Sequence, residues 1–300
     1  MRFGLGWASL RRMSLTLLQI SDPHLSAKRP LFQWNWEIAL EEAARIRPDL
    51  IVVSGDLSLD GSNDPEDLAF AAAQCARLPA PWLAIPGNHD IGDGPEAPAS
   101  AHPITSVRIA LWREQFGRDW WDHDFGRWRL IGINAHLIGA ALPEEAEQEL
   151  FLERALAQAG KPILFFLHLP PFALHEGESE NAAAAMAPKA RERLAQLLGA
   201  AEIAAIACGH VHQSFETYWG GRRVVWAPST SMVTRLGFWA ALPGRDKTGL
   251  VEWRLTEDGR ALSRTLTPEL FIDYDVTNWA EGGGYGQMLS RPHPTMIKPR

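Results

Sequence analysis

The chain has 300 residues, a formal net charge of -7 at pH 7 and only two cysteines, Cys75 and Cys208. This length is enough for one large α/β domain. The negative charge argues against a general nucleic-acid binder and against stable binding to an anionic membrane, since both need a basic surface. Two cysteines within apolar segments argue against a disulfide framework. We therefore expect a globular protein of the cytoplasm.

Residues 1–13 are interpreted as an N-terminal extension, because they contain no sustained apolar segment and no small-residue cleavage site. The apolar run that follows them leads directly into residues assigned below to the active site. The pair Arg11-Arg12 is therefore not expected to mark a cleaved export signal. No apolar run in the sequence reaches membrane-spanning length.

Apolar runs of strand length alternate with alanine- and leucine-rich segments of helical spacing, which predicts an α/β layered fold with partly parallel sheets. The predicted strands are Leu15–Ile20, Leu50–Ser54, Trp82–Ile85, Arg129–Ile133, Ile163–Leu167 and Ile203–Cys208. The predicted helices are Trp36–Ile46, Pro65–Leu78, Gln148–Ala159 and Pro188–Leu198. Asn35 is expected to cap the first helix, Asp64-Pro65 to begin the second and Gly160 to end the third.

From Gln213 onward, short apolar runs are separated by Gly-Gly, Pro-Gly and Asp-Gly turns, which predicts antiparallel strands that complete a second sheet. These strands are Ser214–Trp219, Arg222–Ala227, Leu250–Leu255 and Ala261–Leu266. We expect a single domain over residues 14–276. Two segments are expected to be irregular, the loop Ile91–Thr105 and the tail 277–300, as lids, contact arms or disorder.

Polar side chains follow five of the predicted strands, at the point where each strand ends. In open α/β sheets this edge is where ligands bind. The residues are Asp22 and His24, Asp56, Asn88 with His89 and Asp90, His168, and His210 with His212. Glycines at positions 55, 87 and 209 stand just before a ligand candidate, where a tight turn or a close backbone approach is plausible.

Seven of these side chains, all but His89 and Asp90, are the candidates for metal ligands. Oxygen and imidazole ligands without a thiolate suit Mn²⁺, Fe, Zn²⁺ or Co²⁺. Seven ligands are too many for one tetrahedral ion but suit two ions if one carboxylate bridges them. Asp22 and His24 are expected on one side of an extended segment, and so are His210 and His212. Each motif alone would more often be a turn, a helix cap or a buried polar group; the ordered set makes that reading improbable.

The ordered set Asp-x-His, Gly-Asp, Gly-Asn-His-Asp, His and Gly-His-x-His resembles the calcineurin-like metallophosphoesterases, over about Leu15 to Ser231. The segments Gly55–Gly61 and His168–Pro171 are most similar to the branch of class III cyclic nucleotide phosphodiesterases and glycerophosphodiesterases. That branch usually has His-His-Pro-Pro where this chain has His168-Leu169-Pro170-Pro171. The difference concerns neighbouring pocket contacts rather than the metal ligands.

The resemblance implies a four-layer αββα sandwich with two mixed β-sheets, and it implies roles for the site residues. Asp22, His24 and His212 would hold one ion, Asn88, His168 and His210 the other, and Asp56 would bridge them. His89 would contact the phosphoryl oxygen or the leaving group without binding a metal, and Asp90 would orient it. Two ions about 4 Å apart can hold a hydroxide that attacks phosphorus in line. The implied partner is a small-molecule phosphate ester, and a homo-oligomer is left open.

For several other residues we favour a structural or surface role over contact with the substrate. Trp34 and Trp36 follow the first metal-binding loop and could stack on a substrate ring, but packing at the start of a helix is the simpler role. His175 lies near the predicted rim and could contact substrate, but a surface position is the favoured interpretation; Asn134 or His136 could reach the phosphate-binding side, which we do not favour. The remaining candidates are treated as surface, namely His102, His123, His293 and the helix start Glu144–Glu149.

The favoured function is a phosphodiesterase acting on a cyclic nucleotide or a glycerophosphodiester. A phosphomonoesterase such as a nucleotidase is the alternative, and the sequence barely separates the two. A pyrophosphatase of lipid-linked sugar nucleotides is disfavoured, because such relatives tend to carry arginine at the position of His89. A nuclease is disfavoured by the acidic charge. A binding scaffold that has lost its ligands is disfavoured because all seven ligand positions are filled.

Overall fold

The structure is a computed structural model. It describes residues 14–97, 100, 102–158, 160–178, 184–235 and 240–276. The predicted N-terminal extension, residues 1–13, and the predicted tail, residues 277–300, lie outside the described residues, as does His293.

The first sheet has five strands in the order β12-β11-β1-β2-β3. Their bounds are β1 Ser14–Ile20, β2 Leu50–Ser54, β3 Trp82–Ile85, β11 Leu250–Thr256 and β12 Ala261–Leu266. β1, β2 and β3 are parallel, and β11 runs antiparallel to both of its neighbours. Leu17 points to a core shared with the second sheet, whereas Leu18 and Ile20 point to a core shared with helices. Burial on both faces explains why this strand is an almost unbroken apolar run.

The second sheet has six strands in the order β4-β5-β6-β7-β9-β8. Their bounds are β4 Trp121–Phe125, β5 Trp128–Gly132, β6 Ile163–Phe166, β7 Ile203–Cys208, β8 Phe215–Trp219 and β9 Arg222–Trp226. The four central strands are parallel, and the two edge strands are antiparallel to their neighbours. A separate parallel pair joins β10, Met232–Val233, to β13, Tyr274–Asp275.

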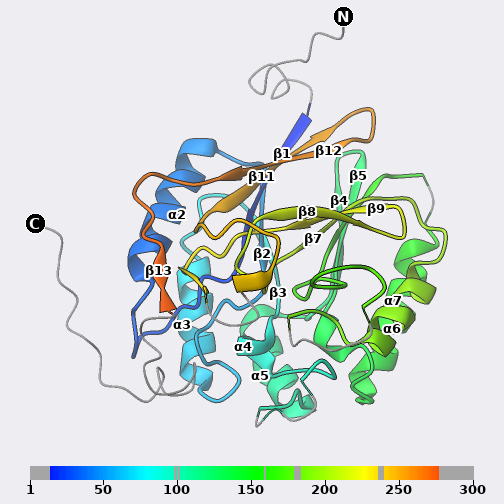
Figure 1. Cartoon of the computed structure of the whole chain (residues 1–300), viewed down its shortest axis with the longest axis horizontal. Coiled ribbons are helices and arrows are strands. Elements are labelled where there is room, and N and C mark those ends of the chain that lie inside the picture. Colours follow the sequence, from blue (N-terminus) through cyan, green and yellow to red (C-terminus); the bar gives the residue numbers. More distant parts are fainter. Residues whose placement is uncertain are drawn as a thin grey trace, which may run out of the picture.

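The two sheets lie side by side between two layers of helices (Figure 1). The helices are α2 Gln33–Ile46, α3 Pro65–Cys75, α4 Asn88–Ile91, α5 Ser106–Phe116, α6 Pro143–Leu156 and α7 Pro188–Leu198, with a 3-10 turn, η1, at Ala135–Leu137. One apolar core lies between the sheets and one lies under each helix layer. This is the predicted four-layer αββα sandwich. None of the helices in the described part of the chain is both long and apolar enough to cross a bilayer.

The predicted strands and helices are present, with shifts at their ends. The third helix begins five residues before the predicted Gln148, at Pro143, and ends at Leu156, before Gly160. The predicted start of the second helix at Asp64-Pro65 is confirmed, and the Asp64 side chain caps this helix by accepting a hydrogen bond from Glu66 N. The sequence did not predict helices α4 and α5 or strands β4, β10 and β13.

The expectation that all the late strands complete the second sheet is wrong for β11 and β12. Only β8 and β9 join that sheet. β11 returns to the first sheet and pairs with β1 along Ser14 to Gln19. This pairing satisfies the backbone groups along the open side of β1, which would otherwise be an exposed edge next to a buried strand.

Asn35 is not a helix cap, contrary to the prediction. Helix α2 begins two residues earlier, at Gln33, and has no side-chain cap. The Asn35 side chain is fully buried and donates to the carbonyls of Thr230, Ser231 and Ile272, and it accepts from Ile272 N. It therefore ties α2 to two segments about 195 and 237 residues further along the chain.

Replacing Asn35 with alanine is expected to lower the free energy of unfolding by about 3 kcal/mol or more, since buried backbone groups on two segments lose their partner. Urea unfolding measures this loss. Asp64→Ala is the matched control and should cost about 1 kcal/mol, because it removes a helix cap and an ion pair with Lys28 at the protein surface. A loss for Asn35→Ala no larger than that of the control would contradict the structural role given to Asn35.

Candidate metal centre

The predicted site residues meet at the carboxyl ends of strands from both sheets. The first sheet contributes Asp22 and His24 after β1, Asp56 after β2, and Asn88 in α4 after β3. The second sheet contributes His168 after β6, with His210 and His212 after β7. In Figure 1 this is the end of the sheets at which β3 leads into α4. The site thus spans the edge between the two sheets.

Two groups of side chains offer ligand atoms that lie within 4.8 Å of one another, and Asp56 belongs to both groups. One group is Asp22, His24, Asp56 and His212, and the other is Asp56, His168 and His210. Asp56 Oδ1 accepts a hydrogen bond from His89 N at 2.9 Å. Its other oxygen, Oδ2, lies 3.7 Å from His24 Nε2 and 3.3 Å from His168 Nε2. One carboxylate oxygen is therefore held by the backbone while the other faces both groups.

Most of these ligand candidates have an unusual backbone conformation. Among the described residues, seven other than glycine have a positive φ, and five of the seven are ligand candidates. They are Asp22 (53°), His24 (46°), Asp56 (51°), His210 (69°) and His212 (57°). This left-handed region costs about 1–2 kcal/mol for a residue with a Cβ. Such strain gathers at functional sites, where the surrounding structure can impose it.

The expectation that Asp22 and His24 lie on one side of an extended segment is therefore wrong. The chain turns instead of continuing as a strand, because Asp22 N donates to Gly55 O and His24 N donates to Asp56 O. These hydrogen bonds bind the turn after β1 to the turn after β2. The left-handed φ angles of His210 and His212 contradict the same expectation for that pair.

Two glycines make the close packing of the ligands possible, as their positions in the sequence predicted. Gly55 has a φ of +98°, and a Cβ built on it would lie 2.1 Å from His168 Nδ1. A Cβ on Gly87 would lie 2.2 Å from Asp56 Oδ1 and 2.7 Å from His168 Nε2. Both distances are shorter than any non-bonded contact allows, so no side chain fits at either position.

The buried charges of the site compensate one another. Burial alone would lower the pKa of His168, but Asp56 and Asp22 raise it to about 10. Burial alone would raise the pKa of Asp56, but His168, His89 and His24 hold it well below its usual value. Two buried carboxylates thus create a field that favours positive charge at the rim. The same field attracts a metal cation, whose binding would displace the proton from the imidazole.

The side chains that surround the ligands fix their orientation. His168 Nδ1 donates to Ser54 O at 2.8 Å, which leaves Nε2 as the ring atom that could bind a metal. His89 Nδ1 donates to Leu59 O at 2.9 Å, and its ring lies 4.7 Å from the His24 ring, centroid to centroid. His89 is therefore next to the first group of ligands, on the strand-end loop that also carries Asn88.

Asp90 does not contact the His89 side chain in the way that we expected. Its two oxygens accept hydrogen bonds from Leu57 N, Ser58 N, Ser58 Oγ and Gly87 N. Burial and the charge of Asp56 raise its pKa to about 6. Asp90 thus holds the turns after β2 and β3 together through these hydrogen bonds.

The other residues that the sequence analysis considered are either buried or hydrogen-bonded away from the ligands, or exposed at the surface. Trp36 is fully buried in a core, and Trp34 donates to Leu270 O, so both have packing roles. His102 and His175 are exposed. Asn134 does not reach the ligands, because its amide donates to Asp119 Oδ2. His136 is fully buried, with its ring centroid 5.9 Å from that of His168.

Sequence reasoning missed two groups that support the site. Ser229 Oγ and Ser231 N both donate to Asp22 O. The position of this Ser-Thr-Ser run just after β9, at the same edge of the sheet, was the available signal. Glu96 is buried and contacts His136. It lies in a loop rich in Gly, Pro and Ala, 40 residues from its partner, and no local pattern indicates it.

One further observation, at the side chain of Asn88, indicates that this set of residues is suited to binding metal. Asn88 Oδ1 is buried and has no hydrogen-bond partner in the described part of the chain. A buried polar atom of this kind is costly unless it binds something. A carboxamide oxygen in company with carboxylates and imidazoles is a suitable ligand for a divalent metal of the Mn²⁺, Fe²⁺ or Zn²⁺ type.

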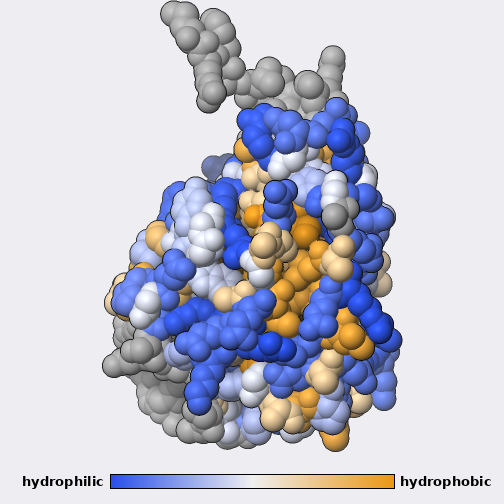
Figure 2. Space-filling view, turned by 90° about the vertical axis from the view of Figure 1, so that its right-hand side faces the viewer, coloured by the Kyte–Doolittle hydropathy of each residue, from blue (hydrophilic) through white to orange (hydrophobic). Residues whose placement is uncertain are grey.

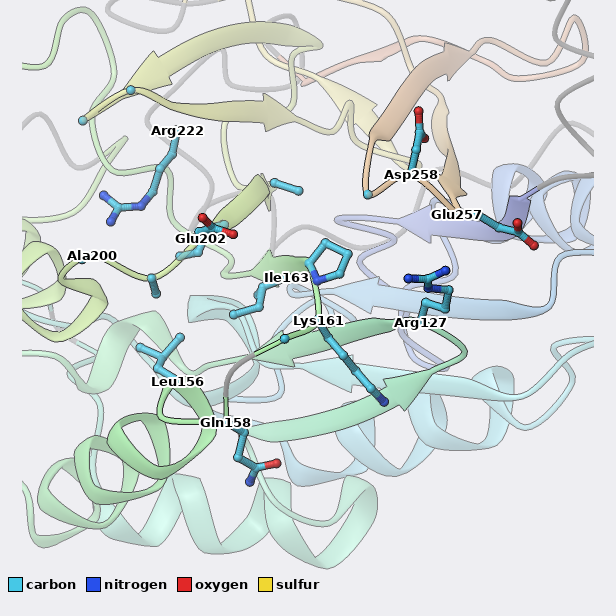
Figure 3. Close-up of a pocket in the computed structure, with 18 residues that line it drawn as sticks. Arg127, Leu156, Gln158, Lys161, Ile163, Ala200, Glu202, Arg222, Glu257 and Asp258 are labelled. Atoms are coloured by element: carbon cyan, nitrogen blue, oxygen red, sulfur yellow. The ribbon is translucent and has the colours of Figure 1, made fainter.

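The large hollow of about 1040 Å³ shown in Figure 3 is not this site. It lies at the opposite ends of β6 and β7, where these strands begin, and none of the predicted site residues lines it. Its charged side chains have both signs and include Arg127, Lys161, Arg222, Glu202 and Asp258. On the side of α6 and α7 the molecular surface is largely hydrophilic around one apolar hollow (Figure 2).

The sequence model described as calcineurin-like phosphoesterase matches residues 15–214, which contain every ligand candidate. The chain belongs to this family. The phosphoesterase is 30% identical over 239 residues to a probable glycerophosphodiester phosphodiesterase, GpdQ, of Arcobacter nitrofigilis, covering 72% of this chain and 79% of the relative. It is 30% identical over 224 residues to the 3',5'-cyclic adenosine monophosphate phosphodiesterase CpdA of Escherichia coli K12, covering 71% and 75%.

The fold agrees with this membership. A dimetal phosphatase from Danio rerio has a TM-score of 0.53 with 14% sequence identity, covering 84% of this chain and 99% of that structure. The phosphoesterase is therefore a hydrolase of phosphate esters with a buried Asp/His cluster that can bind metal. The location in the cytoplasm stays a prediction, and whether the protein forms a homo-oligomer stays open.

Gly87→Ala is expected to abolish tight metal binding in the phosphoesterase, because the added Cβ would displace Asp56 or His168. Metal content after gel filtration, measured by plasma mass spectrometry, tests this. Gly177→Ala is the matched control, since a Cβ there meets only His175 Nδ1 at 3.8 Å. Full metal content in Gly87→Ala would show that the turn can move without loss of the ligands.

Proposed function

We propose that this phosphoesterase is a two-metal phosphodiesterase that acts on a small diester such as a cyclic nucleotide or a glycerophosphodiester. The observation that carries the two-ion centre is the presence of Asp56 in both ligand groups. In this proposal Asp22, His24 and His212 hold one ion, and Asn88, His168 and His210 hold the other. Asp56 would be shared by the two ions, since its Oδ2 atom faces both groups.

When bound, the two ions lower the pKa of a water molecule and polarise the phosphoryl oxygens, which supplies a nucleophile at neutral pH. The protein residues hold the ligands rigidly for this chemistry. Asp56 Oδ1 is fixed by His89 N, and both oxygens of Asp22 lie 3.2 Å from His210 N. Rigid ligands matter because catalysis by oriented charge needs little rearrangement during the reaction.

His89 is the residue that we propose for contact with the substrate. Its Nδ1 is engaged by Leu59 O, so Nε2 is the atom that can approach the phosphate ester. From its place beside His24 it can neutralise charge on a phosphoryl oxygen or protonate the leaving oxygen. The hydrogen bond to Leu59 O orients its ring, and the orienting role that the family implies for Asp90 stays a prediction.

The proposal of a diester substrate rests on the similarity to relatives named as GpdQ and CpdA, both of them diesterases. It also rests on the segments Gly55–Gly61 and His168–Pro171. A phosphomonoesterase is the alternative, because two-ion centres of this type serve both classes of ester. A metal-bearing binding scaffold is disfavoured, since every ligand candidate is present and the ligand groups converge.

Turnover of diesters is expected to be faster than turnover of monoesters by the Mn²⁺-loaded protein. Bis(p-nitrophenyl) phosphate, p-nitrophenyl phosphate, a cyclic nucleotide and a glycerophosphodiester, assayed side by side at equal concentration, test this. A higher kcat/KM for the monoester would support the alternative. No turnover of any ester, with two ions bound per chain, would favour the scaffold.

His89→Ala is expected to leave the metal content unchanged while kcat falls about a hundredfold for an ester with a poor leaving group. The loss should be smaller for p-nitrophenyl esters, whose leaving group needs little protonation. His123→Ala on β4 is the control and should behave as the wild type. An equal loss for both kinds of ester would limit His89 to binding phosphoryl oxygens. Loss of an ion would remove the proposed role altogether.

A further inference from the structure

A buried pair formed by Glu96 and His136 lies against the metal centre. His136 Nδ1 is 2.7 Å from Glu96 Oε1, and the two side chains are 0% and 4% exposed. The same Glu96 oxygen accepts a hydrogen bond from Gly94 N at 2.8 Å. The ring of His136 packs on that of His168 at 5.9 Å between centroids, with the two planes inclined by 40°. The pair therefore touches a ligand candidate without belonging to either ligand group.

The pair connects segments that come from different sheets. Glu96 lies eight residues after Asn88, on the loop that continues from β3 and α4. His136 follows β5, whose neighbour β6 ends just before His168. The proposed second ion requires Asn88 from one sheet and His168 from the other at a fixed spacing. The Glu96–His136 contact joins the loop that follows Asn88 to the segment after β5, whose neighbouring strand β6 leads into His168.

Packing alone does not account for a histidine at this position. His136 Nε2 is buried and has no hydrogen-bond partner within the described residues. Leaving such an atom unpaired costs about 1–3 kcal/mol, so an apolar ring of similar size would stabilise the fold better. The hydrogen bond to Glu96, rather than packing, therefore explains why position 136 carries an imidazole. In metal sites, carboxylate–imidazole pairs next to the ligands commonly orient them and tune metal affinity.

We propose that Glu96 and His136 are positioning residues for the second metal site, holding His168 and the segment after Asn88 at the spacing that this ion requires. The inference rests on the proposed two-ion centre. Ser54 O fixes the His168 ring at Nδ1, and the His136 ring limits its tilt. Loss of the pair frees both the ring and the loop. The ion held by Asn88, His168 and His210 is then bound more weakly, whereas the ion at His24 and His212 is unaffected.

Stepwise removal of metal from the loaded, full-length protein tests this proposal. The Mn²⁺-loaded chain is exposed to rising concentrations of a chelator, and retained metal is measured by plasma mass spectrometry. Glu96→Ala and His136→Phe should each release one ion per chain at a chelator concentration at least tenfold below that of the wild type, and keep the other ion. Glu96→Gln should stay within about threefold of the wild type, because its amide oxygen still accepts from His136.

The control is Ser100→Ala, which should retain both ions. It removes two other hydrogen bonds of the same loop, one from Ser100 Oγ to Asp93 and one from His102 N to Ser100 Oγ. Release of both ions together by His136→Phe would overturn the proposal, and so would release indistinguishable from the wild type. Unfolding midpoints measured in excess chelator compare the stabilities of the metal-free variants. A variant that has only lost stability would release both ions together, which is the outcome that overturns the proposal. A wild-type chain that holds a single ion would instead overturn the two-ion centre itself.

Discussion

Two buried carboxylates, Asp22 and Asp56, must lie close together at the edge between the two sheets, and much of the structure serves this requirement. Burial and mutual repulsion both oppose ionisation of these acids, and the neighbouring imidazoles compensate for it. The backbone contributes to the cost, because five ligand candidates adopt left-handed φ angles. The extensive apolar cores on both faces of each sheet supply the stability that tolerates such strain.

The spacing between the sheets is set near the ligands by polar contacts as well as by apolar packing. Gln19 is fully buried between the sheets and donates to Ser54 Oγ and to Cys208 O, while it accepts from Trp253 Nε1. The bond from His168 to Ser54 O crosses the same boundary. Buried hydrogen bonds have strict geometry, so they fix the relative position of the sheets more sharply than apolar contacts do. The ligand candidates come from both sheets, so their spacing depends on a precisely fixed position of one sheet relative to the other.

The sequence was sufficient to predict most of the described strands, the ligand candidates and the crowded glycines, because these depend on local patterns. An apolar run followed by Gly and a polar residue describes a buried strand and its end, as at Ser54-Gly55-Asp56. The partners of Asp90, Asn35 and Glu96 could not be predicted in the same way. Each depends on residues that lie far away in the sequence, and local propensity contains no information about such pairs. The extended geometry assumed for Asp22 and His24 failed because hydrogen bonds to the neighbouring turn override the strand pattern.

Leu169 departs from the motif of the branch, and it shows that neighbouring residues serve different parts of the structure, one the metal centre and the next the apolar core behind it. Leu169 is 1% exposed and packs in the core under α6 and α7. An imidazole at this position would enter an apolar environment and would need a partner there. The change from His to Leu therefore affects packing behind the site, whereas His168, one residue earlier, still points to Asp56. Adjacent residues at the end of a strand face opposite sides, so the rim can keep its chemistry while the core behind it changes.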